Sequence, residues 1–145
     1  MARLQVSGIA ELNKLLSDLA DDIQGEGIDK ALIAGGELLA EFFVGATVAE
    51  GLVDTGQLRD SMAATKPEGS PKYVDVYPQG TRSDGKRNAE VGAYMEYGVT
   101  RIPPLKDVPA THWMSNAVDD TKEDVLDAME ASINETIDKH FGGND

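Results

Sequence analysis

Residues 92–117 restrict the fold more than any other stretch, because prolines and a glycine interrupt them. Pro103, Pro104 and Pro109 lack a backbone N–H group and push the preceding residues into extended conformations. Gly98 can adopt the left-handed conformation that ends a helix. We therefore predict a semi-rigid loop over residues 99–110 and exclude a central strand there. The loop leads to Trp113, the only tryptophan, which we expect to fix the loop to the core.

Three helices are predicted from apolar residues that recur at helical spacing. They cover about residues 9–23, 28–49 and 113–141, and we interpret their apolar stripes as core-packing faces. The stripe of the first helix consists of Leu12, Leu15, Leu16, Leu19 and Ile23. The stripe of the last helix consists of Met114, Ala117, Val118, Val125, Met129, Ile133 and Ile137.

Glycines punctuate the two N-terminal helices. Gly25 and Gly27 are predicted to break the chain between them. Gly35 and Gly36 lie inside the second helix, where each glycine costs about 1 kcal/mol relative to alanine. We expect this pair to mark either a close crossing against another element or a bend.

The other segments predict a small antiparallel sheet joined by loops. Residues 58–65 and 73–77 are predicted strands, and residues 3–6 could form an edge strand. Turns are predicted at residues 54–56, where Gly56 permits a positive φ, and at residues 67–71. Residues 79–88 predict a mobile loop, and residues 89–97 fit a strand or, as we favour, a short helix. The predicted fold is α+β, one domain over residues 1–145, with two N-terminal helices and a long C-terminal helix packed on the sheet.

Composition narrows the classes of function. The chain has 26 acidic and 13 basic residues, a net charge of −13, which disfavours tight binding to nucleic acid. Cysteine is absent, so disulfides and cysteine metal sites are excluded, in keeping with a reducing cytosol. We expect no signal peptide and no membrane span, because no run approaches the ~18 apolar residues that a span needs.

No catalytic, cofactor or metal site is predicted. Asp119, Asp120, Glu123 and Asp124 place carboxylates on one helix face and would serve the alternative of a small metal-dependent hydrolase. A solvated face near a helix N-terminus explains them better. His112 and His140 have no partner at metal-ligand spacing, and Ser61 and Ser115 lack a nucleophile-elbow pattern. These observations favour a binding or structural role.

Two further groups have competing interpretations. The bases Arg82, Lys86, Arg87 and Arg101 could contact phosphate, could be ordinary loop bases, or could meet acidic faces of neighbouring copies. We favour the neighbouring copies over nucleic acid because the net charge is so negative. Glu96 could be a buried catalytic acid, but we favour a structural carboxylate that accepts backbone N–H groups or pairs with Arg59 or Arg101.

The order of these segments resembles the tail-completion, or head–tail joining, proteins of long-tailed bacteriophages and prophages. The resemblance rests on residues 55–61 (Thr-Gly-Gln-Leu-Arg-Asp-Ser), residues 87–91 running into residues 95–98 (Met-Glu-Tyr-Gly), the proline loop, Trp113 and Ala117. The matching positions that we expect to be structural anchors are Gly56, Leu58, Glu96, Gly98 and Trp113. The chain departs from the family in two ways: Pro109 lies four residues before the large aromatic, and the loop is longer.

The resemblance implies a non-enzymatic virion protein with an α+β fold and no cofactor. Such proteins form a ring, typically hexameric, at the head-proximal end of the tail, and they join the tail tube to the neck or connector. We expect a location in the virion, with assembly in the host cytoplasm, and an acidic ring lumen through which DNA slides without specific binding. An acidic regulator of a nucleic-acid-binding partner is a further alternative.

Overall fold

A computed structural model describes residues 2–52 and 56–142 and shows an α+β chain. The helices are α1 (Ala2–Asp22), the π-helical turn η1 (Ile23–Gly27), α2 (Ile28–Ala49), α3 (Gln57–Asp60), α4 (Asn88–Tyr97) and α5 (Trp113–Gly142). The strands are β1 (Met62–Ala64) and β2 (Val76–Pro78). The predicted second and third long helices and the short helix over residues 89–97 are confirmed.

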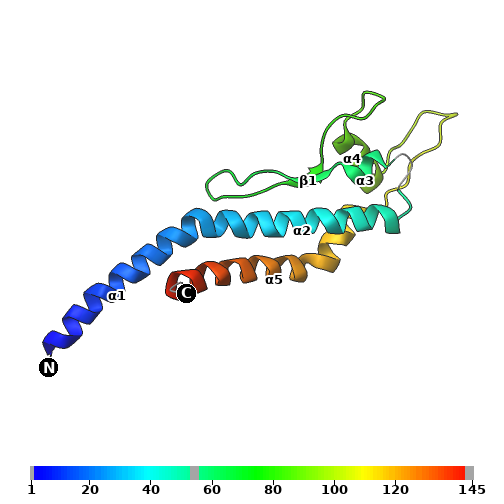
Figure 1. The fold of residues 1–145 in the computed structure, drawn as a ribbon. Coiled ribbons are helices and arrows are strands. Elements are labelled where there is room, and N and C mark those ends of the chain that lie inside the picture. The colour runs from blue at the N-terminus through cyan, green and yellow to red at the C-terminus, as the bar shows by residue number, and fades with distance from the viewer. Residues whose placement is uncertain (1, 53–55, 143–145) are drawn as a thin grey trace.

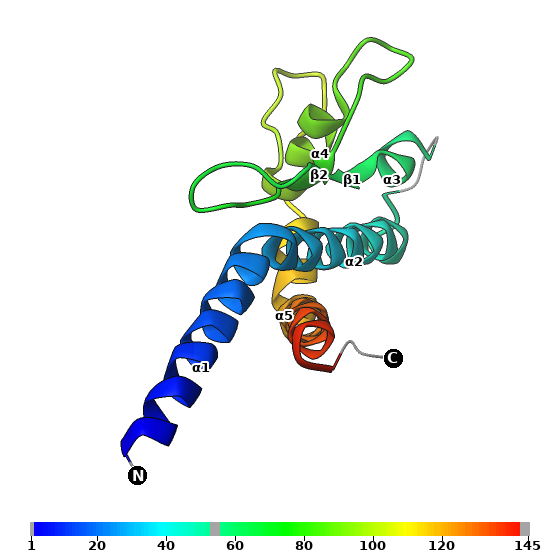
Figure 2. The ribbon, with the colours of Figure 1, turned by 60° about the vertical axis from the view of Figure 1, so that its left-hand side comes forward.

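The predicted break between the first two helices is present as a kink at Gly25, which leaves helical geometry with φ −85° and ψ −105°. Gly27 stays helical, and the π-helical turn η1 joins the two helices into one bent rod. The predicted edge strand at residues 3–6 is wrong, because α1 already begins at Ala2 and no proline stops it. As a result α1 projects from the end of α2 and away from the rest of the molecule (Figure 1; Figure 2).

The bent rod of α1, η1 and α2 bears on the expectation that the chain has no membrane span. Glu11–Ala49 is one bent helix of 39 residues that is, by length and composition only, long and apolar enough to cross a membrane, so the expectation that no segment could span one is not met. The core helix of a folded domain has the same composition. Ala31, Ala40 and Phe43 of α2 are buried inside this domain.

The two adjacent glycines of α2 let the helix pack closely on both sides. A Cβ atom on Gly35 would lie 2.7 Å from Met129 Cγ of α5, and one on Gly36 would lie 2.9 Å from Ala64 Cβ of β1. The expected close crossing is therefore present, and α2 lies between α5 and the sheet (Figure 1).

The sheet is smaller than predicted. Its two antiparallel strands pair Met62 with Pro78 and Ala64 with Val76. Residues 57–60 form the helical turn α3 instead of the start of a strand, because this turn places Leu58 in the core with only 4% of its surface exposed. Gly56 precedes the turn with a φ of 81°, as predicted, whereas Asp54 and Thr55 lie outside the described residues.

The core lies where the N-terminal end of α5 meets α2, α3 and α4. Phe43, Leu58, Trp113 and Ala117 form its buried centre, and the rings of Phe43 and Trp113 meet edge to face with centroids 5.9 Å apart. Val118, which was assigned to the buried stripe of α5, is exposed.

Leu12, Leu15 and Leu16 of α1 lie outside this core, so the core-packing interpretation is wrong for them within one chain, whereas Leu19 and Ile23 are half-buried. Leu12, Leu15 and Leu16 are 51%, 46% and 49% exposed. The reason is the direction of α1, which leaves the paired α2 and α5 beyond the end of α5 (Figure 2).

Candidate functional site

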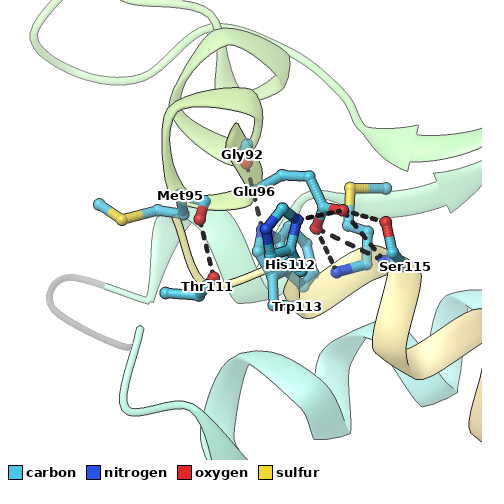
Figure 3. Close-up of polar contacts among 8 residues, drawn as sticks. Gly92, Met95, Glu96, Thr111, His112, Trp113 and Ser115 are labelled. Carbon is cyan, nitrogen blue, oxygen red and sulfur yellow. Dashed lines mark hydrogen bonds and ion pairs between the residues drawn. The ribbon is translucent and has the colours of Figure 1, made fainter. Parts of the chain in front are cut away.

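Glu96 caps the N-terminus of α5 from a distance of 18 residues in sequence. Its Oε2 accepts a hydrogen bond from the Met114 backbone N–H at 2.7 Å, and its Oε1 accepts one from the Ser115 N–H at 3.2 Å (Figure 3). The Ser115 hydroxyl donates to the same carboxylate. A carboxylate at this position satisfies otherwise unpaired N–H groups and complements the positive end of the helix dipole. Glu96 therefore has the geometry of a structural cap.

The same region fixes the end of the proline loop. The Thr111 N–H and hydroxyl both donate to the Met95 carbonyl at 2.8 Å, and the Trp113 Nε1–H donates to the Gly92 carbonyl at 3.1 Å. Trp113 is only 1% exposed. Gly98 follows α4 with a φ of 76°, and a Cβ atom there would lie 2.7 Å from the Val108 carbonyl oxygen. These contacts join α4, the loop and α5 into one unit.

The neighbouring Ser115 and His112 do not form a nucleophilic pair with Glu96. In a serine triad the histidine bonds the serine and the acid lies behind the histidine. Here the acid itself accepts the serine hydroxyl, and His112 Nδ1 lies 4.0 Å from Glu96 Oε1 with a side chain 60% exposed. The arrangement supports capping and supplies no base to Ser115.

Three of the four predicted contact bases surround one pocket. Arg82, Lys86 and Arg101 line a cavity of about 200 Å³ together with one acid, Asp84, and apolar residues such as Leu58 and Tyr94. The Arg82 side chain is 16% exposed, and its Nε is buried without a hydrogen-bond partner, 3.9 Å from Asp84 Oδ1. We call this cavity the basic pocket. It brings together bases from two loops that lie apart in sequence.

Arg87 lies outside the basic pocket. Its guanidinium Nη2 donates to Glu90 Oε1 at 2.8 Å, and its side chain is 71% exposed. This hydrogen bond and the positive charge of Arg87 lower the pKa of Glu90 below its ordinary value. Of the four bases that the sequence analysis grouped together, Arg87 is therefore the one that does not line the pocket.

The loop over residues 79–88, which carries Arg82, Lys86 and Arg87, is closed by backbone hydrogen bonds. Arg82 N–H donates to the Lys86 carbonyl at 2.7 Å, and Asn88 N–H donates to the Gly80 carbonyl at 3.0 Å. The mobility predicted for residues 79–88 stays a prediction.

The acids proposed for a metal site do not converge. Asp119, Asp120, Glu123 and Asp124 are all exposed along α5. Within residues 2–52 and 56–142, no group of three or more histidines, aspartates and glutamates is placed to hold a metal ion.

An apolar groove opens between α4 and α5, beside β2. It has a volume of about 470 Å³ and is lined mainly by Tyr77, Pro78, Ala93, Tyr97, Met114 and Val118. Tyr97 is 75% exposed, and Tyr77 and Val118 are also exposed. We call this surface the α4–α5 groove.

A second exposed apolar surface lies on α1. We call Leu12, Leu15, Leu16 and Leu19 the leucine face; the first three are exposed and Leu19 is half-buried. Near its C-terminal end, α1 is attached to the end of α5: His140 Nδ1 lies 3.0 Å from Asp22 Oδ2, and His140 Nε2 lies 3.2 Å from the Leu15 carbonyl oxygen.

Comparison with known proteins identifies no relative: the chain matches no protein-family model, no curated protein and no solved structure. The geometry of the chain itself must therefore support any function. Sequence reasoning missed both apolar surfaces, since it assigned the leucine face and Val118 to the core and treated Tyr97 only as part of the segment over residues 95–98 that supports the family resemblance. One signal in the sequence could have indicated exposed apolar surface. A single chain with three long apolar helix stripes and only a small predicted sheet has little other structure with which to cover them.

Proposed function

We propose that this chain is a structural assembly protein that acts by contact with other protein subunits. The observation that carries the proposal is the number of large apolar side chains left exposed on the single chain, among them Leu12, Leu15, Leu16, Tyr97 and Ile102. Soluble monomers rarely leave such patches uncovered, and larger patches mark interaction sites. Here the leucine face and the α4–α5 groove both remain open, and Ile102 and Leu105 of the proline loop are exposed as well.

The basic pocket supports the same proposal. In a chain with a net charge of −13, three bases and one acid, Asp84, line one cavity, and the buried Arg82 Nε makes no hydrogen bond although Asp84 Oδ1 lies 3.9 Å away. A buried guanidinium nitrogen of this kind is satisfied well by a carboxylate. Acidic faces of neighbouring copies would supply such groups in abundance.

The resemblance to tail-completion proteins gives the assembly its proposed identity. We infer a ring, hexameric by that analogy, at the head-proximal end of a phage or prophage tail, where it joins the tail tube to the neck. The Glu96 cap and buried Trp113 agree with this role because they stiffen the unit that carries the groove. In this role the chain needs no bound cofactor.

The test measures mass in solution and in the assembled particle. Sedimentation and native mass spectrometry of the purified chain, alone and with a tail-tube protein, should show a closed oligomer in at least one condition. Electron microscopy should place it at one end of the tube. A chain that stays monomeric and does not bind tail tubes in either measurement would contradict the proposal.

A further inference from the structure

We propose that His140 is a proton-dependent latch for α1. It holds α1 against the C-terminal end of α5 when its ring carries two protons, and it releases α1 when one proton leaves. The inference concerns the conformation of one chain and does not rest on the proposed assembly role. It goes beyond that role by making the direction of α1 depend on pH.

Both ring nitrogens of His140 face hydrogen-bond acceptors on α1. Nδ1 lies 3.0 Å from Asp22 Oδ2, and Nε2 lies 3.2 Å from the Leu15 carbonyl oxygen. An ionised carboxylate and a backbone carbonyl can only accept hydrogen bonds. A neutral imidazole carries one N–H group, whereas the imidazolium carries two. Only the doubly protonated ring therefore makes both hydrogen bonds at once.

The other charged groups near the ring leave Asp22 to His140. Lys30 Nζ lies 3.7 Å from Glu26 Oε2, and Lys139 Nζ lies 3.0 Å from Glu135 Oε1, so each of these bases already has an acid of its own. The charged groups on the elements around the ring are Asp18 and Asp22 of α1, Glu26 of η1, Lys30 of α2, and Glu135 and Lys139 of α5.

The position of the ring makes the loss of a proton matter. The His140 side chain is 13% exposed, and the ring of Phe141 meets it edge to face with centroids 5.2 Å apart. In the neutral ring one nitrogen lone pair points at an oxygen lone pair of α1, and a ring that is packed in this way cannot turn toward water without leaving its place. One of the two contacts is then lost.

The kink at Gly25 gives α1 a place to turn. Gly25 leaves helical geometry, and nothing lies within 4 Å of the position that its Cβ atom would occupy. Two residues later the chain is held, because a Cβ atom on Gly27 would lie 3.2 Å from Thr136 Cγ2 of α5. Asp22 and Leu15 both precede the kink, so α1 is an arm that begins beyond a fixed point (Figure 2).

Few other contacts fix the direction of α1. Three of the four side chains of the leucine face are exposed, and only Leu19 of that face and Ile23 at the kink are half-buried. Beyond the latch, α1 projects away from α2 and α5 (Figure 1). The two hydrogen bonds of His140 are therefore a large part of what holds the arm.

The direction of the pH effect follows from counting protons. The attached arm binds one proton more than the released arm with a neutral ring, so attachment is favoured at low pH and is lost as the pH rises. Histidine is the side chain that ordinarily changes charge between about pH 5 and 8. The arm is fixed at the acid end of this range and mobile at the other end.

Distances between two spin labels test the latch in the full chain, and the absence of native cysteine makes the labelling specific. The labels are attached to Asn13→Cys on α1 and Ala131→Cys on α5, which are exposed and uncharged positions. The distance distribution should be narrow at about pH 5.5 and should become roughly twice as broad at about pH 8. Nitrogen NMR of the unlabelled chain should show both ring N–H groups of His140 at the lower pH.

Asp22→Asn distinguishes a proton-dependent latch from a merely structural contact. The new amide can donate to a neutral Nδ1, which leaves the Nε2–H for the Leu15 carbonyl, so this variant should keep the narrow distribution at both pH values. His140→Ala should give the broad distribution at both. The matched control is His112→Asn at the other end of α5, where a φ of 51° suits asparagine, and it should keep the pH response of the parent chain.

Three results would overturn the proposal. The first is an unchanged distribution across the pH range in the parent chain. The second is a broad distribution of Asp22→Asn at the higher pH, and the third is loss of the pH response in His112→Asn. If His140→Ala does not fold, as circular dichroism will show, the NMR signals of His140 still decide: a ring with a single N–H group in the attached state refutes the latch.

Discussion

At the scale of single residues, stability is concentrated where the proline loop meets α5. Trp113 fills the core against Phe43, and Glu96 supplies the capping group that the start of α5 lacks in its own sequence. Both residues hold the start of α5 and the end of α4 in place, and Glu96 also lines the α4–α5 groove. Changes at these positions should therefore act first on folding.

Trp113→Ala should destabilise the chain by about 3–5 kcal/mol, the range for large-to-small changes of buried aromatics. The side chain is 1% exposed, and its indole N–H donates to the Gly92 carbonyl. Urea unfolding followed by circular dichroism measures the change without relying on tryptophan fluorescence. A near-neutral result would mean that Trp113 is not a core residue.

Glu96→Gln should destabilise the chain by about 1–3 kcal/mol, because the amide nitrogen cannot accept a hydrogen bond and leaves a buried N–H unpaired. The affected donors are the backbone N–H groups of Met114 and Ser115. Glu90→Gln is the matched control: it removes the same charge from the more exposed Arg87 pair on α4 and should change stability much less than Glu96→Gln. Equal effects of the two changes would contradict the capping role.

At the scale of elements, α2 determines the layered arrangement because it packs against α5 on one side and the sheet on the other. The close approach depends on Gly35 and Gly36, which leave no room for a side chain. Sequence analysis predicted a close crossing or a bend at this pair, but it could not predict which element each glycine would face.

Gly36→Ala should destabilise the chain by roughly 1–3 kcal/mol through overpacking, despite the better helix propensity of alanine. Its Cβ would lie 2.9 Å from Ala64 Cβ, an atom that cannot move without the backbone of β1. Gly45→Ala is the control in the same helix, since nothing lies within 4 Å of its Cβ, and it should stabilise by about 0.5–1 kcal/mol. Thermal unfolding of both variants distinguishes packing from propensity, and stabilisation by both would refute the close crossing.

At the scale of the whole molecule, the chain has a small core and long open surfaces. The basic pocket, the leucine face and the α4–α5 groove lie on different parts of one chain, an arrangement suited to several simultaneous protein contacts.

Replacing Lys86 and Arg101 together by alanine should leave the fold intact and weaken assembly with other copies or with the tail tube. Both side chains line the basic pocket and are exposed, whereas Arg82 is mostly buried and its loss would also disturb packing. Lys66→Ala with Lys122→Ala, two exposed bases outside that pocket, changes the net charge equally and should have little effect. Sedimentation measures assembly and circular dichroism measures folding. Unchanged assembly of the Lys86/Arg101 variant would exclude the pocket from the interface.

The sequence by itself determined the features that local physical chemistry controls. Apolar spacing located α2 and α5 close to their observed bounds, and glycine conformation explained Gly56 and Gly98. The α+β class followed from the same signals. These features depend on residues within a few positions of each other, so they can be predicted from the amino-acid sequence alone.

Only the tertiary structure decided what covers each apolar face and which distant residues meet. Helical spacing shows that α1 has a leucine face but not that α1 points away from the core, which depends on the bend at Gly25. The pairing of Glu96 with the start of α5 and the meeting of Arg82 with Arg101 likewise join separate segments. The physical reason is that burial is a property of the packed whole, whereas a sequence pattern states only that a face prefers to be buried.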